Sequence, residues 1–164
     1  MRGVARRPDP ERLAVWRLLL ETHAAVVDRL GEELEAECGL PLTWYDVLLQ
    51  LSGAPQGRLR MRDLADAVLL SRSGLTRLVD RMEAAGLVCR EAHASDRRGA
   101  NAVLTPAGRA ALRRAAPVHL RGIEAHFARH LSDAEVETLR AALDRVAGAE
   151  RSGPSGGPAD PALI

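Results

Sequence analysis

The sequence contains no lysine, and all 23 of its basic residues are arginine. We attribute this bias to a GC-rich coding sequence, so a single arginine is not evidence for a phosphate site. Cysteine is also scarce. Cys38 and Cys89 are too few for a disulfide framework, which favours a reducing compartment. Aromatic residues make up only 2% of the chain, and a core of leucine, valine and alanine favours helices over sheet.

Long apolar runs and common enzymatic motifs are missing as well. No run approaches the ~18 apolar residues of a membrane span, and residues 1–10 lack an apolar signal segment. We therefore expect a cytoplasmic protein that does not enter a membrane. The HExxH, GxSxG and CxxC motifs and the glycine-rich phosphate loop are absent, and the acidic residues are dispersed. We expect neither an enzyme nor a cofactor.

Two polar ends flank a helical middle. Residues 1–10 and 148–164 are predicted to be a disordered arm and tail. Residues 11–40 are predicted to form a long helix, because apolar residues recur in a heptad seam. The seam consists of Leu13, Trp16, Leu20, His23, Val27, Leu30 and Leu34. It must pack against another long helix, from this chain or from a second one.

The C-terminal third is predicted to form two more helices. Thr105 is the expected N-cap of a helix that starts with Pro106, runs to about residue 130 and kinks at Pro117. Ser132 is the expected N-cap of the last helix, over residues 133–147.

Residues 41–105 show the order helix, turn, helix, two-stranded hairpin. The predicted elements are helices 43–52, 61–68 and 71–86 and strands 87–91 and 101–105, with a polar loop between the strands. Thr43 and Ser71 are the expected N-caps, Gly86 ends the third helix, and Cys89 is expected to face the core. This order predicts a mainly α fold with a small β-hairpin wing, a winged helix-turn-helix.

The predicted helix 71–86 has an unusual outer face. Its core face consists of Leu75, Leu78, Val79 and Met82. Facing away are Ser73, Thr76, Arg77 and Asp80, with Arg72 on the flank. Short hydroxyl side chains let a helix approach a DNA groove closely, and arginine offers a bidentate fork for guanine or phosphate. The alternative is a solvated face in a module that binds another protein.

The polar loop of the hairpin adds a second basic feature. Asp96 stands beside Arg97 and Arg98 in this loop. An arginine at a wing tip can enter the narrow, strongly negative minor groove beside a major-groove site, with Asp96 orienting one guanidinium. Residues 58–98 hold nine arginines against six acids, so this region is basic although the formal net charge of the chain is +1.

The segment DLADAVLLSRSGLTRLVDRMEAAGLVCREAHASDRRGANAVLTPAGR closely resembles the winged-helix core of the MarR regulators. The combination of GLV, DRR and LTPAG carries the likeness, which extends over residues 11–147. It implies a homodimeric transcriptional regulator, held together by helices in residues 11–40 and 106–147. The regulator would bind a pseudo-palindromic duplex operator, as a repressor, through the domain of residues 41–105.

The resemblance also assigns contacts with DNA. They are Arg60, Arg62, Ser71, Arg72, Ser73, Thr76, Arg77, Asp96, Arg97 and Arg98. Two residues depart from the family pattern. Leu69 stands where many helix-turn-helix turns have glycine, and Met61 occupies a position often held by a serine or threonine cap.

A small aromatic or phenolic effector is a further implication of the resemblance. A pocket between the dimer helices and the DNA-binding lobe is hypothesised, and ordinary core packing is the alternative. Its candidate lining is Trp16, His23, Trp44, Tyr45 and His119.

A metal- or redox-responsive regulator on the same fold is a weaker alternative. His119, His126 and His130 lie along one edge of a predicted helix, but no companion ligand is fixed in the sequence, so we expect no metal. Cys38 follows an acidic helix end, which disfavours a reactive thiolate.

Overall fold

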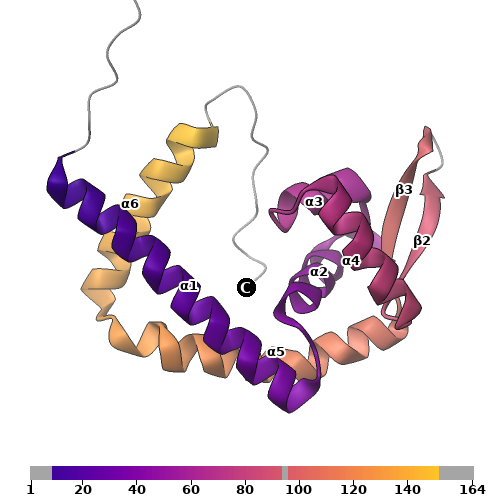
Figure 1. The fold of residues 1–164 in the computed structure, drawn as a ribbon, viewed down its shortest axis with the longest axis horizontal. Helices are drawn as coiled ribbons and strands as arrows, with labels where there is room; N and C mark the ends of the chain where they lie inside the picture. The colour runs from indigo at the N-terminus through magenta and orange to yellow at the C-terminus, as the bar shows by residue number, and fades with distance from the viewer. Residues whose placement is uncertain (1–8, 94–95, 152–164) are drawn as a thin grey trace, which may run out of the picture.

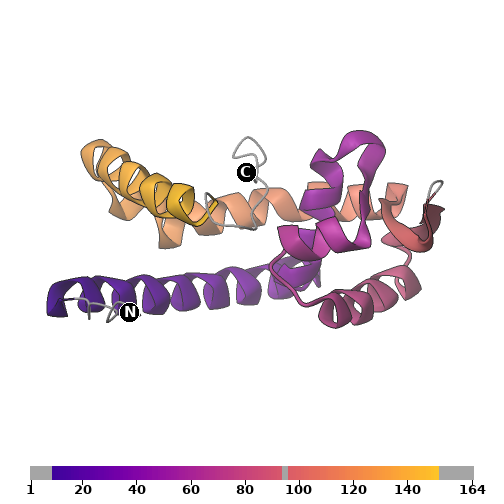
Figure 2. The ribbon, with the colours of Figure 1, turned by 90° about the horizontal axis from the view of Figure 1, so that it is seen from above.

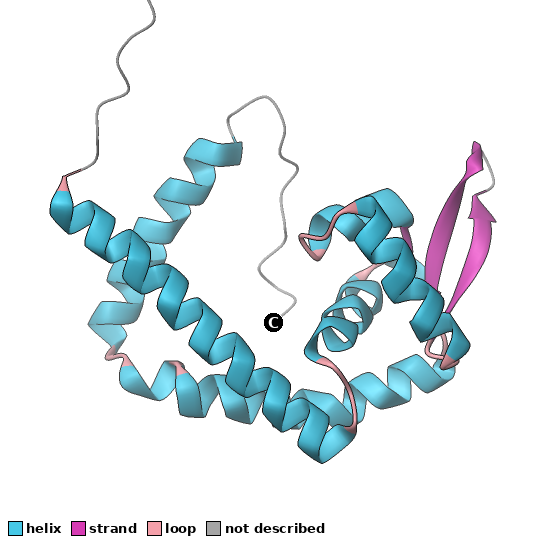
Figure 3. Cartoon of the chain, viewed as in Figure 1, coloured by secondary structure: helices cyan, strands magenta, loops and turns pink. Residues whose placement is uncertain are grey.

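The computed structural model describes residues 9–93 and 96–151, and most of them are helical. Figure 1 and Figure 3 show the arrangement of the elements. In chain order they are α1 (Pro10–Cys38), α2 (Leu42–Gly53), η1 (Pro55–Gly57), β1 (Arg58–Arg60), α3 (Met61–Ala67), α4 (Arg72–Ala84), β2 (Val88–His93), β3 (Asp96–Leu104), α5 (Pro106–His126), η2 (Ala128–His130) and α6 (Asp133–Arg151).

The helices form two limbs joined by α5. One limb contains α2, α3, α4 and the sheet, and the other contains most of α1 together with α6 (Figure 1). α5 packs against both α1 and α2. Figure 2 shows that α1 and α6, which cross in the view of Figure 1, lie in different layers.

The core lies in the limb that carries α4. Buried side chains from α2, α3, α4, the sheet and α5 form one cluster, to which the end of α1 adds Leu34. The expected core face of α4 is confirmed. Its apolar residues Leu75, Leu78, Val79 and Met82 are at most 4% exposed. Burying each of these side chains contributes about 1.5–3 kcal/mol, which fixes the rotation of α4 about its axis.

The predicted caps of α4 and α5 are confirmed. Ser71 Oγ accepts from the Gly74 N–H at 3.1 Å, and Thr105 Oγ1 accepts from the Gly108 N–H at 3.0 Å. Thr43 as the cap of α2 is wrong. α2 begins one residue earlier, because the carbonyl oxygen of Pro41 already accepts the N–H groups of residues 44 and 45.

The sheet has three antiparallel strands in the order β1-β3-β2. β1 was not predicted from the sequence, and the hairpin loop expected between residues 91 and 101 was too long. β2 runs to His93 and β3 starts at Asp96, so most of the predicted loop belongs to the two strands. The main chain of a strand forms the same hydrogen bonds whether its side chains are polar or apolar. The polar side chains between residues 91 and 101 were therefore a poor guide to where the two strands end.

Strand alternation corrects the placement of Cys89. Val88 is 1% exposed on the inner face of the sheet. Ala102, which pairs with Arg90, is 0% exposed on the same face. Successive side chains point to opposite faces, so Cys89 lies on the outer face, where it is half-buried.

α1 and α6 extend beyond their expected bounds, whereas α5 ends at His126, short of the expected residue 130. Asp9 caps α1 by accepting from the Arg12 N–H at 2.9 Å, and α6 includes residues 148–151, which were expected in the tail. Pro117 lies inside α5, which continues through it. Within the described residues, no helix is long and apolar enough to span a membrane.

Candidate nucleic-acid interface

The turn between α3 and α4 sets the position of α4, the helix whose polar face was predicted to point away from the core. Leu69 has a φ of 54° and is 91% exposed, while the Leu70 N–H donates to the Ala65 carbonyl oxygen at 3.0 Å. A left-handed conformation costs a leucine roughly 1–2 kcal/mol. Leu69, at a position where many helix-turn-helix turns have glycine, therefore leaves the turn intact but strained.

α4 begins with a side-chain cap, and the main-chain N–H groups of its first turn point towards its N-terminal end. Ser71 caps it, and a Cβ at position 74 would stand 3.0 Å from Ser71 Oγ, so only glycine leaves this cap undisturbed. Helix N-termini carry partial positive charge, which favours phosphate. At the start of α3, by contrast, no side chain caps the helix. The cap position is Arg60 and Met61 is the first helical residue, so the expectation that Met61 occupies the cap position is wrong by one residue.

The outward face of α4 presents the predicted polar residues to solvent. Arg72, Ser73, Thr76 and Arg77 are all exposed. Thr76 Oγ1 donates to the Arg72 carbonyl oxygen at 2.9 Å, so the methyl group and the lone pairs of the hydroxyl oxygen remain available. Within residues 9–93 and 96–151, neither Arg72 nor Arg77 forms an ion pair with an acid.

The two arginines at the start of α3 differ in their exposure to solvent. Arg60 is half-buried at the N-cap position of α3, and Arg62 is exposed in the first turn. Arg62 Nε contacts Asp63 Oδ1 at 2.9 Å, a surface pair that contributes little to stability.

The wing is the ribbon of β2 and β3, which projects at the end of the molecule beside α4 (Figure 1). The main chain of Asp96, Arg97 and Arg98 belongs to β3, rather than to a loop as predicted. Their side chains lie outside the described part of the chain. The base of the ribbon is joined to β1 by an exposed pair between Arg58 Nη1 and Glu91 Oε2, 3.3 Å apart.

Arg90 is a residue of the interface that the sequence analysis did not single out. Its guanidinium contacts Asp80 Oδ1 and Glu83 Oε2 at 2.7 Å each and donates to the Thr76 carbonyl oxygen at 3.1 Å. Asp80, predicted to face outward with the reading residues, is thus tied to the wing. The two acids spaced i,i+3 on α4 were visible in the sequence. The inward position of Arg90 follows only from the strand register, because Cys89 was expected to face the core.

Comparisons with known proteins identify the family to which this fold belongs. The model of the MarR family matches residues 39–99. The HTH-type transcriptional regulator PecS of Dickeya dadantii is 31% identical over 123 residues, which cover 74% of this chain and 73% of PecS. The chain belongs to the MarR family of transcriptional regulators. It is a DNA-binding regulator and not an enzyme.

Two solved structures of MarR family regulators from Streptomyces coelicolor extend the likeness to nearly the whole chain. AbsC is 36% identical, with a TM-score of 0.81 over 90% of this chain and 99% of AbsC. Sco3205, solved in complex with DNA, is 32% identical, with a TM-score of 0.82 over 94% of this chain and 97% of Sco3205.

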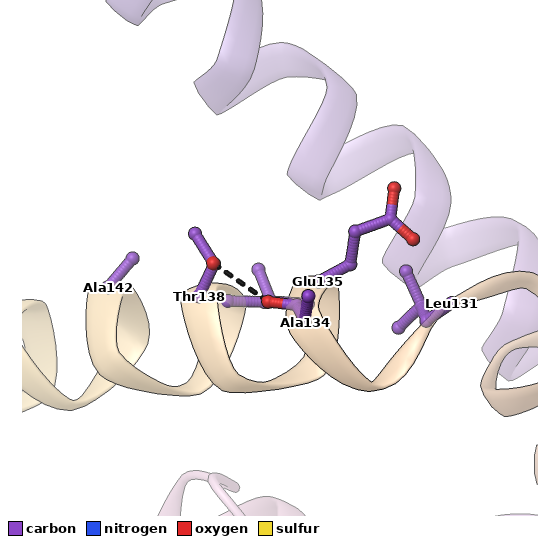
Figure 4. A pocket seen from close by; sticks show the side chains of 6 residues that line it. Leu131, Ala134, Glu135, Thr138 and Ala142 are labelled. Carbon is purple, nitrogen blue, oxygen red and sulfur yellow. Dashed lines mark hydrogen bonds between the residues drawn. The ribbon is translucent and has the colours of Figure 1, made fainter.

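The limb of this MarR regulator that lacks the core exposes many large apolar side chains. On α1 they are Val15, Trp16, Leu18, Leu19 and Leu20, from 42% to 67% exposed. On α5 and α6 they include Leu120, Val136, Leu143 and Val146, from 42% to 64% exposed. A groove of about 420 Å³ also lies along α6, lined by Leu131, Ala134, Glu135, Thr138, Leu139 and Ala142 (Figure 4).

Only part of the hypothesised effector pocket is brought together within one chain. The rings of Tyr45 and His119 lie 4.4 Å apart between centroids, and Trp44 is half-buried beside the core. Trp16 and His23 are exposed on α1. Burial lowers the pKa of His119 and raises that of Tyr45, and His119 Nδ1 is buried without a hydrogen-bond partner among the described residues.

The other two histidines have separate partners. His126 Nε2 lies 2.7 Å from Glu33 Oε1 on α1, and His130 Nε2 lies 3.2 Å from the Ala125 carbonyl oxygen. Among the described residues no group of three potential metal ligands comes together. Cys38 ends α1, with its Sγ 3.9 Å from the Arg114 carbonyl oxygen.

Proposed function

We propose that this MarR family protein is a homodimeric repressor that binds a pseudo-palindromic operator and releases it when a small aromatic or phenolic ligand binds. The observation that carries the DNA-reading part is the outward face of α4. It combines a capped N-terminus, two exposed hydroxyls and two arginines that pair with no acid in the described part of the chain, on a helix whose opposite face is buried.

Each α4 enters a major groove, and each wing lies over the adjacent minor groove. Ser71, Arg72 and Ser73, at the N-terminus of α4, contact phosphate, where the helix dipole adds to the guanidinium charge. Thr76 and Arg77 lie one turn further and reach base edges. Arg60 and Arg62 contact the flanking backbone, and Asp96, Arg97 and Arg98 act on the wing.

The partner of the exposed apolar limb is a second copy of this chain. Side chains such as Val15, Leu18 and Val146 are more than 60% exposed in one chain, and α1 and α6 lie in different layers (Figure 2). Burying this surface against a twofold copy removes it from water and holds the two α4 helices at a fixed distance. We predict a dimer by sedimentation equilibrium. Leu18→Arg places an unpaired charge there and should yield monomers, whereas a dimeric Leu18→Arg protein would contradict this interface.

The proposed effector site centres on Tyr45 and His119. Because burial lowers its pKa, His119 is neutral at pH 7, and its buried Nδ1 needs a partner that an acidic ligand can supply. Trp44 contributes a half-buried aromatic wall. Trp16 and His23, which one chain leaves exposed, are assigned to the part of the pocket completed by dimerisation.

Selection of duplexes from a random library tests the proposed function. We expect half-sites about one helical turn, ~34 Å, apart and related by twofold symmetry. Arg77→Ala should relax the sequence preference, whereas Arg140→Ala, an exposed arginine of α6, should leave it unchanged. Failure to enrich any duplex would contradict the proposal.

Release and repression need their own measurements. Phenolic and aromatic acids are screened for dissociation of the selected duplex, and His23→Leu and His119→Phe are expected to reduce that dissociation. If the ligand dissociates the duplex from both variants as it does from the wild type, the effector site does not include these two histidines. The selected duplex is also inserted at a promoter that drives a reporter gene, and expression of the reporter is measured in cells. The proposed place of action is the cytoplasm, where the protein must meet chromosomal DNA. Expression that rises with the protein present would contradict repression.

A further inference from the structure

One arginine joins the two parts of the molecule that are proposed to read DNA. Arg90 belongs to β2, and its contacts on α4 run from Thr76 to Glu83, about two turns of the helix. Its main-chain N–H also donates to Glu83 Oε1 at 2.8 Å, so Glu83 bridges the main chain and the side chain of Arg90. The Arg90 side chain is 26% exposed, less than either of its acidic partners.

We propose that Arg90 is a positioning residue that locks the wing to α4, so that the two groove-reading elements have one fixed offset before DNA arrives. The inference rests on the proposed roles of α4 and the wing in DNA binding. The covalent link between α4 and β2 is the short turn of residues 85–87, and the two elements also share the buried core. Arg90 adds polar contacts between them outside this core. The set of contacts made by Arg90 on Thr76, Asp80 and Glu83 is called the clamp below.

The geometry suits arginine in particular. Arg90 pairs with Ala102, which is fully buried, so its side chain leaves the inner face of the sheet towards α4. A guanidinium has five donors in a rigid plane and can serve acceptors on successive helical turns at once. A lysine at this position has one ammonium and cannot reach the same set of acceptors.

The clamp does not require Arg90 to touch DNA. Its guanidinium is already directed at two carboxylates and a carbonyl oxygen on α4. What it contributes to binding is pre-organisation, because a wing that is free to swing loses entropy when its contacts and those of α4 form together. The loss of the clamp should therefore reduce the preference for the selected duplex more than the binding to an arbitrary one.

A charge-neutral pair of substitutions tests this. The double variant Arg90→Gln/Glu83→Gln removes most of the clamp while leaving the net charge unchanged. Its matched control is Arg58→Gln/Glu91→Gln, which breaks the exposed pair of the same sheet, also without a net change in charge. Affinity is measured for the selected duplex and for a scrambled duplex of the same length, over a range of salt concentrations.

We expect the clamp variant to lose about tenfold in affinity for the selected duplex, with a smaller loss on the scrambled one and an unchanged salt slope. The control should behave like the wild type on both duplexes. Equal affinities for clamp variant and wild type would overturn the inference. A salt slope shallower by about one or more in the clamp variant would also overturn it, because Arg90 would then contact phosphate.

Two further measurements separate this proposal from a purely structural role and from the proposed function. If the double variant does not fold, Asp80→Asn replaces it, because this substitution weakens the clamp on the α4 side. Asp80→Asn must then also lower the preference for the selected duplex over the scrambled one. Hydrogen exchange of the DNA-free protein is independent of any duplex. We expect faster exchange of the β2 and β3 amides in the clamp variant than in its control, and equal exchange would overturn the inference even if no duplex were selected.

Discussion

The joint between the DNA-reading limb and α5 depends on the missing side chain of Gly108. A Cβ built at this position would lie 2.1 Å from the Leu87 carbonyl oxygen and 2.9 Å from Leu104 Cδ1. That carbonyl oxygen cannot retreat without cost, because it accepts from the Thr105 N–H at 3.2 Å. Alanine in a helix gains at most about 1 kcal/mol over glycine. Overpacking costs about 1–3 kcal/mol, and losing the hydrogen bond costs about 1 kcal/mol more.

Gly108→Ala is therefore expected to destabilise the protein by about 2–3 kcal/mol, which lowers Tm by roughly 5–10 °C for a chain of this size. Gly31→Ala is the control, because its Cβ would meet only Leu42 Cβ, at 3.9 Å. It should raise Tm by about 1–4 °C. Thermal unfolding followed by circular dichroism at one protein concentration checks both. A Gly108→Ala protein as stable as the wild type would refute the close approach.

Three other substitutions test single features of the structure. Leu69→Gly should stabilise the protein by about 0.5–1 kcal/mol, because the relief of the left-handed strain exceeds the added chain entropy, and a loss of stability by urea unfolding would argue against that turn. Ser71→Ala should cost about 1 kcal/mol in the same assay through loss of the α4 cap, and an unchanged midpoint would mean that the cap contributes nothing. His119 has a lowered pKa, so the unfolded chain binds its proton more readily and the stability contributed by this group is lost as pH falls below about 6.5. His119→Phe should flatten the fall in stability between pH 7 and 5, and an identical pH dependence in both proteins would contradict the burial of this histidine.

Much of the helical framework follows from local patterns in the sequence. Ser71 and Thr105 are flanked by the helix signals that their caps require, and the apolar spacing of Leu75, Leu78 and Met82 fixes which side of α4 faces outward. These features depend on residues within a few turns of each other. They could be predicted because no distant contact overrides them.

Features that depend on distant pairing could not be predicted in the same way. β1 has three residues, and it is a strand only because it pairs with residues 101–103 of β3. The clamp of Arg90 depends on strand register, since a shift of one residue would place Cys89 on the inner face instead. The seam of α1 shows the same limit. Its second half, with Leu30 and Leu34, is buried in this chain, whereas Trp16 and Leu20 are about half exposed.

A salt titration of binding to the selected duplex tests the central claim most directly, namely that the start of α4 neutralises phosphate. Each phosphate contact contributes about 0.9 to the slope of log K against log salt concentration. In a dimer, Arg72→Ala removes two such contacts, so the slope should become shallower by about 1.8. Arg140→Ala should leave the slope unchanged, because Arg140 belongs to α6, which lies on the limb far from the wing (Figure 1). A slope that Arg72→Ala does not alter, or that Arg140→Ala alters equally, would contradict the account.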